Sequence, residues 1–400
     1  MKLADRLQSI EPFYVMECAK AAARIAATPA CDPAQGGTPM IYLNIGEPDF
    51  TAPPLVLEAA ARCLAAGRTQ YTDATGLPAL REALSDWYAH QHGLAIDPAR
   101  IVITAGASAA LELVCLALFQ AGDEVLMPDP CYPCNRHFVA AADASAVLLP
   151  CGPEQRYQPD AAGLEAAWTP RTRGVLLASP SNPTGTSIAP DEMARIVQSV
   201  RSRGGVTIAD EIYLGLSHDA AYAGSALAHD APGGADVISV NSFSKYFSMT
   251  GWRLGWLVLP PALVAPVEKL AQNLFICPSS IAQHAALACF EPASIAEYER
   301  RRAAFTARRD WLVPALRGLG FDVPVMPDGA FYVWADCSRH AASSWDFVFD
   351  VMQRAHVALT PGRDFGRAAT GRHLRVSYAS SLEHLQEAVH RLQRLLDAGA

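Results

Sequence analysis

Short apolar runs alternate with amphipathic helical patterns along the first 260 residues. Helical patterns are expected at Pro54–Ala66, Leu77–Gly93, Ala109–Gln120 and Asp191–Arg203. The strand-like runs are Ile101–Thr104, Glu124–Met127, Ala146–Leu149, Gly174–Ala178, Val206–Ala209 and Val237–Val240. Short apolar strands that alternate with helices predict an α/β fold, in which a mainly parallel sheet is covered by helices on both faces.

The two ends of the chain follow a different pattern. The N-terminal segment is mostly helical and ends in a loop, Thr28–Thr38, before the short apolar run Met40–Ile45. After Pro260 the pattern predicts a smaller α+β lobe, with a long mainly helical region and then strands and a closing amphipathic helix. Its expected elements are Ser279–Leu319, Ala330–Ala335, Leu374–Tyr378 and Leu382–Leu396.

The length of 400 residues supports more than one domain, because hydrophobic cores stop growing at about 250–300 residues. We expect a three-layer large domain at residues 48–290 and a small domain at residues 291–400. Residues 1–47 are expected to form an N-terminal arm and part of the small domain.

The composition is that of a folded protein, with 51% hydrophobic and 18% charged residues. The net charge of −8 argues against a nucleic-acid-binding protein, which needs a basic face. A cluster of arginines at 300, 301, 302, 308 and 309 is the main exception. Acidic residues flank the cluster, so we interpret it as a solvated helix face.

Neither a signal peptide nor a membrane span is expected, because charges interrupt the N-terminal segment and no run approaches about 18 apolar residues. We therefore expect a cytoplasmic protein whose ten cysteines are reduced. Cys131 and Cys134 form a C-x-x-C pair, but a second pair for zinc is missing. The sequence around the pair does not resemble a redox motif, and its role stays open.

Candidate chemistry gathers where the predicted strands end, which is where ligands bind in open α/β sheets. Ile101–Thr104 leads into Ala107 and Ser108 at a helix start, where free N–H groups favour an anion. Other polar residues follow the later strands: Asn182, Asp210, Tyr213, Ser242, Lys245 and Arg253. Together they offer an anion cradle, a carboxylate and a lysine.

A phosphorylated cofactor with a protonatable ring nitrogen and an aldehyde needs those three groups. The lysine forms a Schiff base with the aldehyde and later acts as a base. The chain has four lysines, and only Lys245 stands at the end of a predicted strand. Arginine could not replace it, because arginine stays protonated. Each polar residue alone has a structural explanation, but independent strand ends would then all have to mimic one site.

These residues carry a family resemblance. The motifs are Asn44-Ile-Gly-Glu-Pro-Asp-Phe50, Tyr71-Thr with Gly76-Leu-Pro-Ala-Leu-Arg81, Asn182-Pro-Thr-Gly185, Asp210-Glu-Ile-Tyr213 and Ser242-Phe-Ser-Lys245 with Arg253. In this order they resemble the class I/II aminotransferases, which are pyridoxal phosphate (PLP) enzymes of fold type I similar to aspartate aminotransferase. The resemblance covers nearly the whole chain.

The resemblance implies a role for each residue around the cofactor. Lys245 would hold PLP covalently and move the proton at the substrate α carbon. Asp210 would pair with the ring nitrogen, Tyr213 and Asn182 would bond the ring oxygen, and Tyr132 would stack on the ring.

The resemblance also implies how the substrate binds. Arg375 would grip the substrate α-carboxylate with a two-pronged fork, helped by Asn182 and the Gly46 backbone. Tyr71 would reach the phosphate of a neighbouring subunit, which implies a homodimer with shared active sites.

Transamination by a ping-pong mechanism is the expected reaction, with a carbon–sulfur β-lyase and a non-catalytic PLP-sensing regulator as alternatives. Two apolar candidate pocket segments, Phe13–Met16 and Asn273–Cys277, favour neutral or hydrophobic amino acids. The alternative for such apolar segments is a dimer interface. The usual acceptor in the family is 2-oxoglutarate. Its second carboxylate would need a further cation, for which the candidates are Arg24, Arg136 and Arg363.

Overall fold

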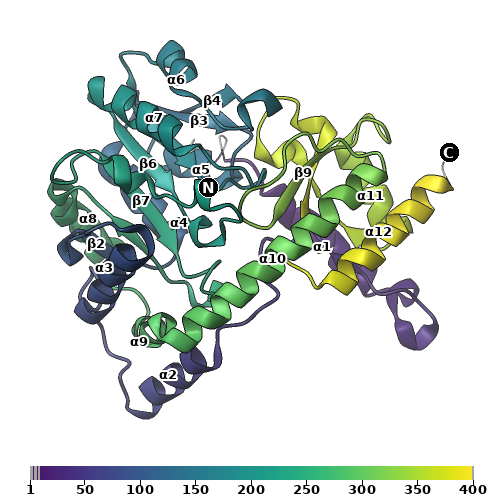
Figure 1. The fold of residues 1–400 in the computed structure, drawn as a ribbon, viewed down its shortest axis with the longest axis horizontal. Coiled ribbons are helices and arrows are strands. Elements are labelled where there is room, and N and C mark those ends of the chain that lie inside the picture. Colours follow the sequence, from purple (N-terminus) through teal and green to yellow (C-terminus); the bar gives the residue numbers. More distant parts are fainter. Residues whose placement is uncertain (1–2, 4–6, 8–9, 399–400) are drawn as a thin grey trace.

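The computed structural model describes residues 3, 7 and 10–398, so Lys2 lies outside the described residues. Figure 1 shows a large sheet-containing region beside a smaller one that holds the C-terminal helix. The long helix α10 (Pro292–Gly318) runs from the base of the large region into the small one. The boundaries at residues 47/48 and 290/291 stay predictions.

The large region is built on a seven-stranded sheet with the order β2-β8-β7-β6-β5-β3-β4. Its strands are β2 Ile101–Thr104, β3 Glu124–Asp129, β4 Ser145–Pro150, β5 Thr172–Ala178, β6 Val206–Asp210, β7 Val237–Ser242 and β8 Gly255–Val258. Neighbouring strands from β4 to β7 pair parallel, and β8 is antiparallel to both β2 and β7. The expected mainly parallel sheet is confirmed. The antiparallel β8 was not predicted, because its four residues directly follow the Arg253 loop.

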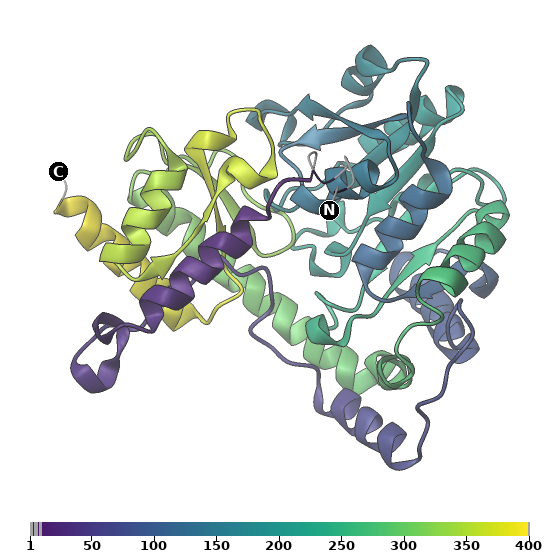
Figure 2. The ribbon, with the colours of Figure 1, turned by 180° about the vertical axis from the view of Figure 1, so that it is seen from behind.

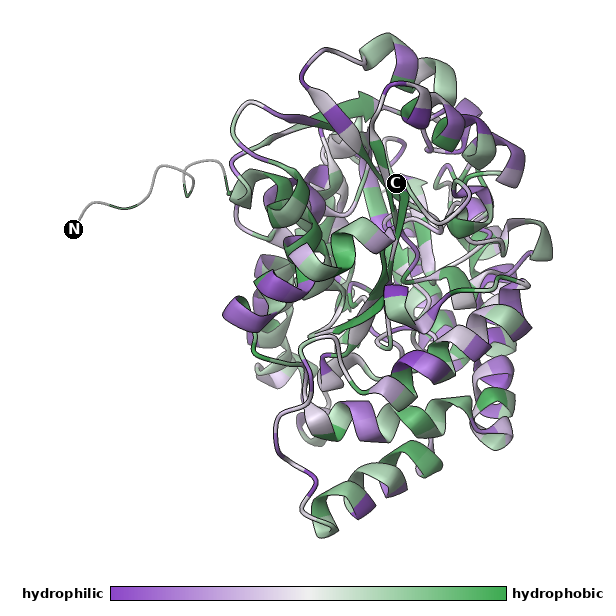
Figure 3. Cartoon of the chain, turned by 90° about the vertical axis from the view of Figure 1, so that its left-hand side faces the viewer, coloured by the Kyte–Doolittle hydropathy of each residue, from purple (hydrophilic) through white to green (hydrophobic). Residues whose placement is uncertain are grey.

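Helices cover both faces of the sheet, as the alternation of side chains along each strand requires. On β3, Val125 and Met127 belong to a different buried cluster from Leu126. The cluster that contains Val125 and Met127 includes residues of α4 (Ala107–Leu118), α5 (Pro133–Ala141) and α8 (Pro261–Leu274). The cluster that contains Leu126 lies on the other face and includes residues of α2 (Pro54–Ala65), α3 (Pro78–His92), α6 (Ala161–Ala167), α7 (Pro190–Ser202) and α9 (Ser280–Ala286). In Figure 3 hydrophobic strands run through the interior.

The small region joins the two ends of the chain. An antiparallel sheet has the order β11-β12-β9, formed by Thr360–Pro361, His373–Ser377 and Tyr332–Asp336. Strand β1 (Ile41–Tyr42) pairs parallel with β10 (Val357–Ala358). Helices α11 (Ser344–Arg354) and α12 (Leu382–Asp397) complete it, and α1 (Tyr14–Ala26) lies across this region in Figure 2. The described segment from α1 to β1 is therefore integrated with the C-terminal third.

The interpretation of the arginine cluster is wrong for two of its members. Arg308 is buried and donates to both carboxylate oxygens of Asp49, at 2.9 and 2.8 Å. Arg301 is also buried and donates to the carbonyl oxygen of Thr51 at 2.6 Å. These two arginines fasten α10 to the segment that follows the arm, whereas Arg300 on the same helix is exposed as expected.

Within the described residues, no helix combines the length and the apolar character needed to cross a membrane.

Candidate active site

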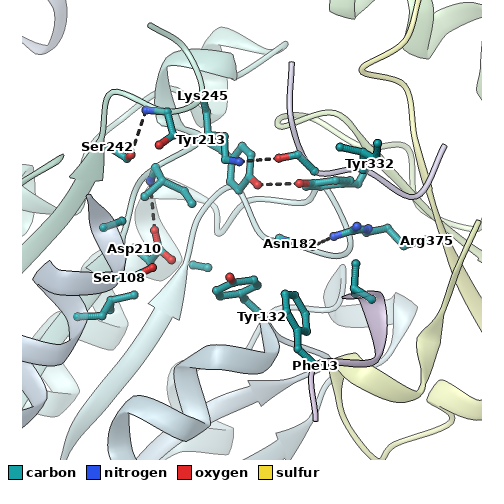
Figure 4. A pocket seen from close by; sticks show the side chains of 18 of the residues that line it. Phe13, Ser108, Tyr132, Asn182, Asp210, Tyr213, Ser242, Lys245, Tyr332 and Arg375 are labelled. Atoms are coloured by element: carbon teal, nitrogen blue, oxygen red, sulfur yellow. Dashed lines mark hydrogen bonds between the residues drawn. The ribbon is translucent and has the colours of Figure 1, made fainter. Parts of the chain in front are cut away.

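A cavity of about 300 Å³ lies at the carboxyl ends of the large-sheet strands, where the small region and the arm meet them. Figure 4 shows side chains from all three parts pointing into it. Eleven residues expected from the sequence line it: Gly46, Ala107, Ser108, Tyr132, Asn182, Asp210, Tyr213, Ser242, Lys245, Arg253 and Arg375. Tyr71 does not, and its side chain is 83% exposed. Its expected role depends on a second subunit and stays a prediction.

Lys245 follows strand β7 and points into the cavity (Figure 4). Its Nζ donates to the carbonyl oxygen of Gly46 at 2.6 Å. Burial lowers the pKa of Lys245 from 10.5 to about 8, with a further contribution from the charge of Arg375. A lower pKa leaves more of the amine unprotonated and nucleophilic near neutral pH. The other two described lysines, Lys20 and Lys269, are exposed.

Asp210 ends strand β6, next to the strand that leads to Lys245. One carboxylate oxygen accepts a hydrogen bond from the backbone N–H of Ile212 at 3.2 Å. Burial raises the pKa of Asp210 from 3.8 to about 7, and the neighbouring charge of Glu211 adds to the rise. A buried carboxylate of this kind favours a cationic partner, which a protonated ring nitrogen would provide.

The anion cradle forms where β2 turns into α4. The cap residue Gly106 has a φ of 86°, and none of the described side chains caps the first N–H groups of the helix. This φ favours glycine, and a Cβ atom on Gly106 would lie 2.8 Å from Nη2 of Arg253, so the guanidinium would have to shift. The helix start and the guanidinium therefore face the same end of the cavity, together with Ser108 and Ser242.

Arg375 lies on β12, in the small region, and is only 3% exposed. Nη1 donates to Oδ1 of Asn182 at 2.9 Å, and Nη2 donates to the carbonyl oxygen of Asn44 at 2.8 Å. Both partners are neutral, and the buried Nε has no hydrogen-bond partner among the described residues. A buried guanidinium without a counter-ion is unfavourable, so this position suits the carboxylate of a ligand.

The N-terminal arm forms an apolar part of the wall. Phe13, Val15 and Met16 line the cavity, as expected from the sequence. The ring of Phe13 meets that of Tyr132 edge to face, with centroids 6.2 Å apart. Asn273–Cys277 lie at the end of α8 and beyond it and do not line the cavity of the single chain. Their expected place in a pocket or a dimer interface depends on a second subunit and stays a prediction.

None of the three candidate cations for a second carboxylate lines the cavity. Arg363 lies 4.1 Å from the ring centre of Tyr14, and Arg136 donates to the carbonyl oxygen of Asp364 at 3.0 Å. Both anchor the arm region instead. Arg24 lies in the last turn of α1.

A set of hydrogen bonds fastens the loop before Tyr132 to the small region. Asp129 ends β3, and its carboxylate accepts from the backbone N–H groups of Arg367 and Ala368, at 2.9 and 3.0 Å. A Cβ atom on Gly366 would lie 1.7 Å from Oδ1 of Asp129, so glycine is required for this close approach. Asp129 therefore links the ring-stacking loop to the part of the chain that precedes Arg375.

Two further residues that line the cavity, Tyr332 and Asn44, were not expected from the sequence. Tyr332 begins β9 of the antiparallel sheet, so no rule about parallel strand ends could find it. Asn44 begins the motif that contains Gly46, so its place two residues before Gly46 could have identified it as a lining residue.

Cys131 follows β3 and Cys134 is the second residue of α5, so the pair stands at a strand–helix junction, which was not expected. Both thiols are free, and burial raises the pKa of Cys131 to about 12 and also raises that of Cys134. Reactive cysteines have lowered values, so the pair has the character of core thiols. The described residues contain no group of three or more side chains that could hold a metal.

The residues present fit PLP. Asp210 is a buried carboxylate for the ring nitrogen, Lys245 is a buried amine for the aldehyde, and the start of α4 with Arg253 is a cradle for the phosphate. The unpartnered Nε of Arg375 leaves a place for a substrate carboxylate.

Comparison with known proteins agrees with this geometry. The family described as aminotransferase class I and II matches residues 38–392. The valine–pyruvate aminotransferase of Mycobacterium tuberculosis is 39% identical over 96% of both chains. An aminotransferase structure from the same organism superposes with a TM-score of 0.93, at 38% identity over all of both chains.

The aspartate aminotransferase of Thermus thermophilus, solved with maleate, has a TM-score of 0.90 at 32% identity, and the match covers 99% of this chain and all of that one. Matches of this length and identity, together with the fitted site, show that the chain belongs to the class I and II aminotransferases and is a PLP-dependent transaminase.

Proposed function

We propose that this enzyme transfers the amino group of a neutral, apolar L-amino acid to a small 2-oxo acid by a ping-pong mechanism. The observation that carries the proposal is the charge of the cavity. Among the described residues that line it, the cations are Lys245, Arg253 and Arg375. Each already has a role: Lys245 bonds the aldehyde, Arg253 holds the phosphate and Arg375 holds the α-carboxylate. A substrate side-chain carboxylate would therefore be buried without a cation, which is unfavourable.

The part of the lining that would face the substrate side chain is apolar, formed by Phe13, Val15, Met16 and Ala19 of the arm. The same argument favours an acceptor with one carboxylate, such as pyruvate. The usual family acceptor, 2-oxoglutarate, has two, and its second would need a cation from outside this set. The name of the valine–pyruvate relative combines a neutral donor with such an acceptor.

We assign the residue roles as follows. Bound PLP supplies an aldehyde and an electron-withdrawing ring. Asp210 holds a proton on the ring nitrogen, and Lys245 takes the proton from the substrate α carbon and later returns it. Tyr132 and Tyr213 orient the ring, and Arg375 holds the α-carboxylate by paired hydrogen bonds.

Asn182 and the Gly46 backbone support the substrate carboxylate, and the phosphate lies against Ala107, Ser108, Ser242 and Arg253. We also propose a homodimer in which Tyr71 of one subunit reaches the phosphate site of the other. The high exposure of the Tyr71 side chain in the single chain supports this arrangement.

A substrate panel tests the proposal. The PLP-loaded protein is assayed with L-valine and L-aspartate as donors, each with pyruvate and with 2-oxoglutarate as acceptor. L-Alanine is assayed as a third donor with 2-oxoglutarate only, because its reaction with pyruvate regenerates the same two compounds. We expect kcat/KM for L-valine to exceed that for L-aspartate by at least about tenfold, because the aspartate side chain would bury an unpaired charge. Aspartate as the best donor would overturn the proposal.

Lys245→Ala is the matched control, and it should lose both activity and the borohydride-trapped cofactor adduct. A protein that releases pyruvate and ammonia from cystathionine without an acceptor would instead be a carbon–sulfur β-lyase.

A further inference from the structure

Tyr332 occupies a central position in the cavity that the roles above leave unused. It is the first residue of β9, it is 1% exposed, and its side chain enters the cavity between Tyr213 and Arg375 (Figure 4). A tyrosine so fully enclosed needs a partner for its hydroxyl group, since a buried polar atom without one is unfavourable.

The hydroxyl group of Tyr332 has its partner in the cofactor half of the site. It lies 2.8 Å from the hydroxyl oxygen of Tyr213, a hydrogen-bonding distance. A Cβ atom on Gly46 would lie 2.6 Å from the same Tyr332 oxygen, so the tyrosine is in close contact with the backbone there. The carbonyl oxygen of Gly46 accepts the hydrogen bond from Lys245. One phenol therefore lies against two elements that surround the cofactor.

The ring of Tyr332 has its partner in the substrate half of the site. The guanidinium carbon of Arg375 lies 4.4 Å from the ring centre, within the range of a cation–π interaction. Arg375 also pairs with Trp334 in the register between β12 and β9, two residues beyond Tyr332. The stacked ring limits the movement of a guanidinium whose Nε has no hydrogen-bond partner.

The proton count decides which phenol donates. Each hydroxyl group carries one proton, and the assigned role of Tyr213 uses its proton on the ring oxygen of PLP. The Tyr213 oxygen is then an acceptor, so Tyr332 must donate to it. A donor that itself accepts a hydrogen bond becomes a stronger donor. Tyr332 thereby strengthens the bond from Tyr213 to the cofactor.

We propose that Tyr332 is a positioning residue that couples the two halves of the site. Its hydroxyl group orients and polarises Tyr213 toward the cofactor ring, and its ring face holds Arg375 in place for the substrate carboxylate. The proposal rests on the assigned roles of Tyr213 and Arg375, and it is independent of which amino acid is the donor.

Tyr332→Phe separates the two contacts, because it removes the hydroxyl group and keeps the ring. The visible absorbance of the PLP-loaded protein is titrated against pH to obtain the pKa of the Lys245–cofactor linkage. A weaker bond from Tyr213 leaves the ring oxygen more available to the proton on the lysine nitrogen. We expect that pKa to rise by roughly half to one unit, the effect of one hydrogen bond. KM for the amino acid should stay within about twofold, since the stacked ring remains.

Tyr332→Leu removes the ring as well. In this variant KM for the amino acid should rise roughly three- to thirtyfold, the range expected for the loss of a buried cation–π contact. Tyr298→Phe is the matched control, because Tyr298 is another fully buried tyrosine that packs on Tyr246 and Phe247 and does not line the cavity. It should leave the absorbance titration and KM unchanged.

A double-mutant cycle with Tyr213→Phe decides whether Tyr332 acts through Tyr213. The Tyr332→Phe change should not shift the pKa of the linkage further when Tyr213 is already phenylalanine. An unchanged titration in Tyr332→Phe, or an equal shift in both backgrounds, would overturn the proposal. The titration needs only bound cofactor, so a failure of the proposed substrate preference would leave this result readable.

Discussion

The cavity has two parts that are built in different ways. The floor, Ala107, Ser108, Asp210, Ser242, Lys245 and Arg253, comes from the ends of strands in one sheet and the turns that follow them. The wall, Phe13, Gly46, Tyr332 and Arg375, comes from the arm and the small region. The topology of a parallel sheet brings the floor together, whereas the wall depends on the packing of segments far apart in the chain.

The electrostatics of the two parts differ as well. On the floor, burial moves the pKa of Lys245 down to about 8, so the amine can exchange a proton near neutral pH, and it raises that of Asp210 to about 7, which favours a cationic partner. On the wall, Arg375 has only neutral hydrogen-bond partners among the described residues. We conclude that the floor is suited to chemistry and the wall to binding.

The largest expected effect comes from the floor. Asp210→Asn keeps the shape of the side chain and an oxygen for Ile212, but it removes the charge that holds a proton on the ring nitrogen. We expect kcat to fall roughly 10²- to 10³-fold, with a much smaller change in KM. Steady-state kinetics with the best donor measures both. A fall in kcat of less than about tenfold would contradict the assigned role of Asp210.

A substitution on the wall is expected to have a smaller effect, and to change KM rather than kcat. Arg375→Lys keeps a positive charge and loses the two-pronged fork, so one charge-assisted hydrogen bond to the substrate carboxylate is lost. We expect KM to rise roughly 10- to 100-fold, while kcat changes less. Arg354→Lys, at an exposed arginine of α11, is the control. If kcat falls and KM stays the same, the division between floor and wall is wrong.

The smallest expected effect comes from the contact that joins the loop before Tyr132 to the small region. Gly366→Ala places a Cβ atom against the carboxylate of Asp129 and separates it from Arg367 and Ala368. We expect the free energy of unfolding to fall by about 1–3 kcal/mol, as for buried hydrogen bonds that lose a partner. Denaturant unfolding of the cofactor-loaded protein measures this. Gly371→Ala, where no atom lies within 4 Å of an added Cβ, should change it by much less.

The floor could be predicted from the sequence and the wall only in part. Strand ends such as those before Asp210 and Lys245 follow from short apolar runs and a general rule about parallel sheets. Arg375 was found only through a family resemblance, and Tyr332 was missed, because antiparallel strands of the small region carry no such rule. Asn273–Cys277 was assigned to the pocket on apolarity alone, a property that pocket walls and subunit interfaces share.

Burial was the other quantity that the sequence did not reveal. Arg301 shares its helix neighbour Glu297 with the exposed Arg300, and Arg308 lies two residues before Asp310, yet both pack against the segment around Asp49. Helical periodicity shows which residues share a face, but it does not show which distant segment covers that face.

The docking of α1 has a consequence for how the protein matures during translation. The first two N–H groups of α1 are capped by Asp364, which accepts from Tyr14 and Val15 at 3.2 and 2.6 Å. This cap does not exist until the ribosome has synthesised Asp364, far beyond Lys245 in the chain. The sheet and Lys245 emerge earlier, so a nascent chain can present the residues that hold the cofactor before it can enclose a substrate.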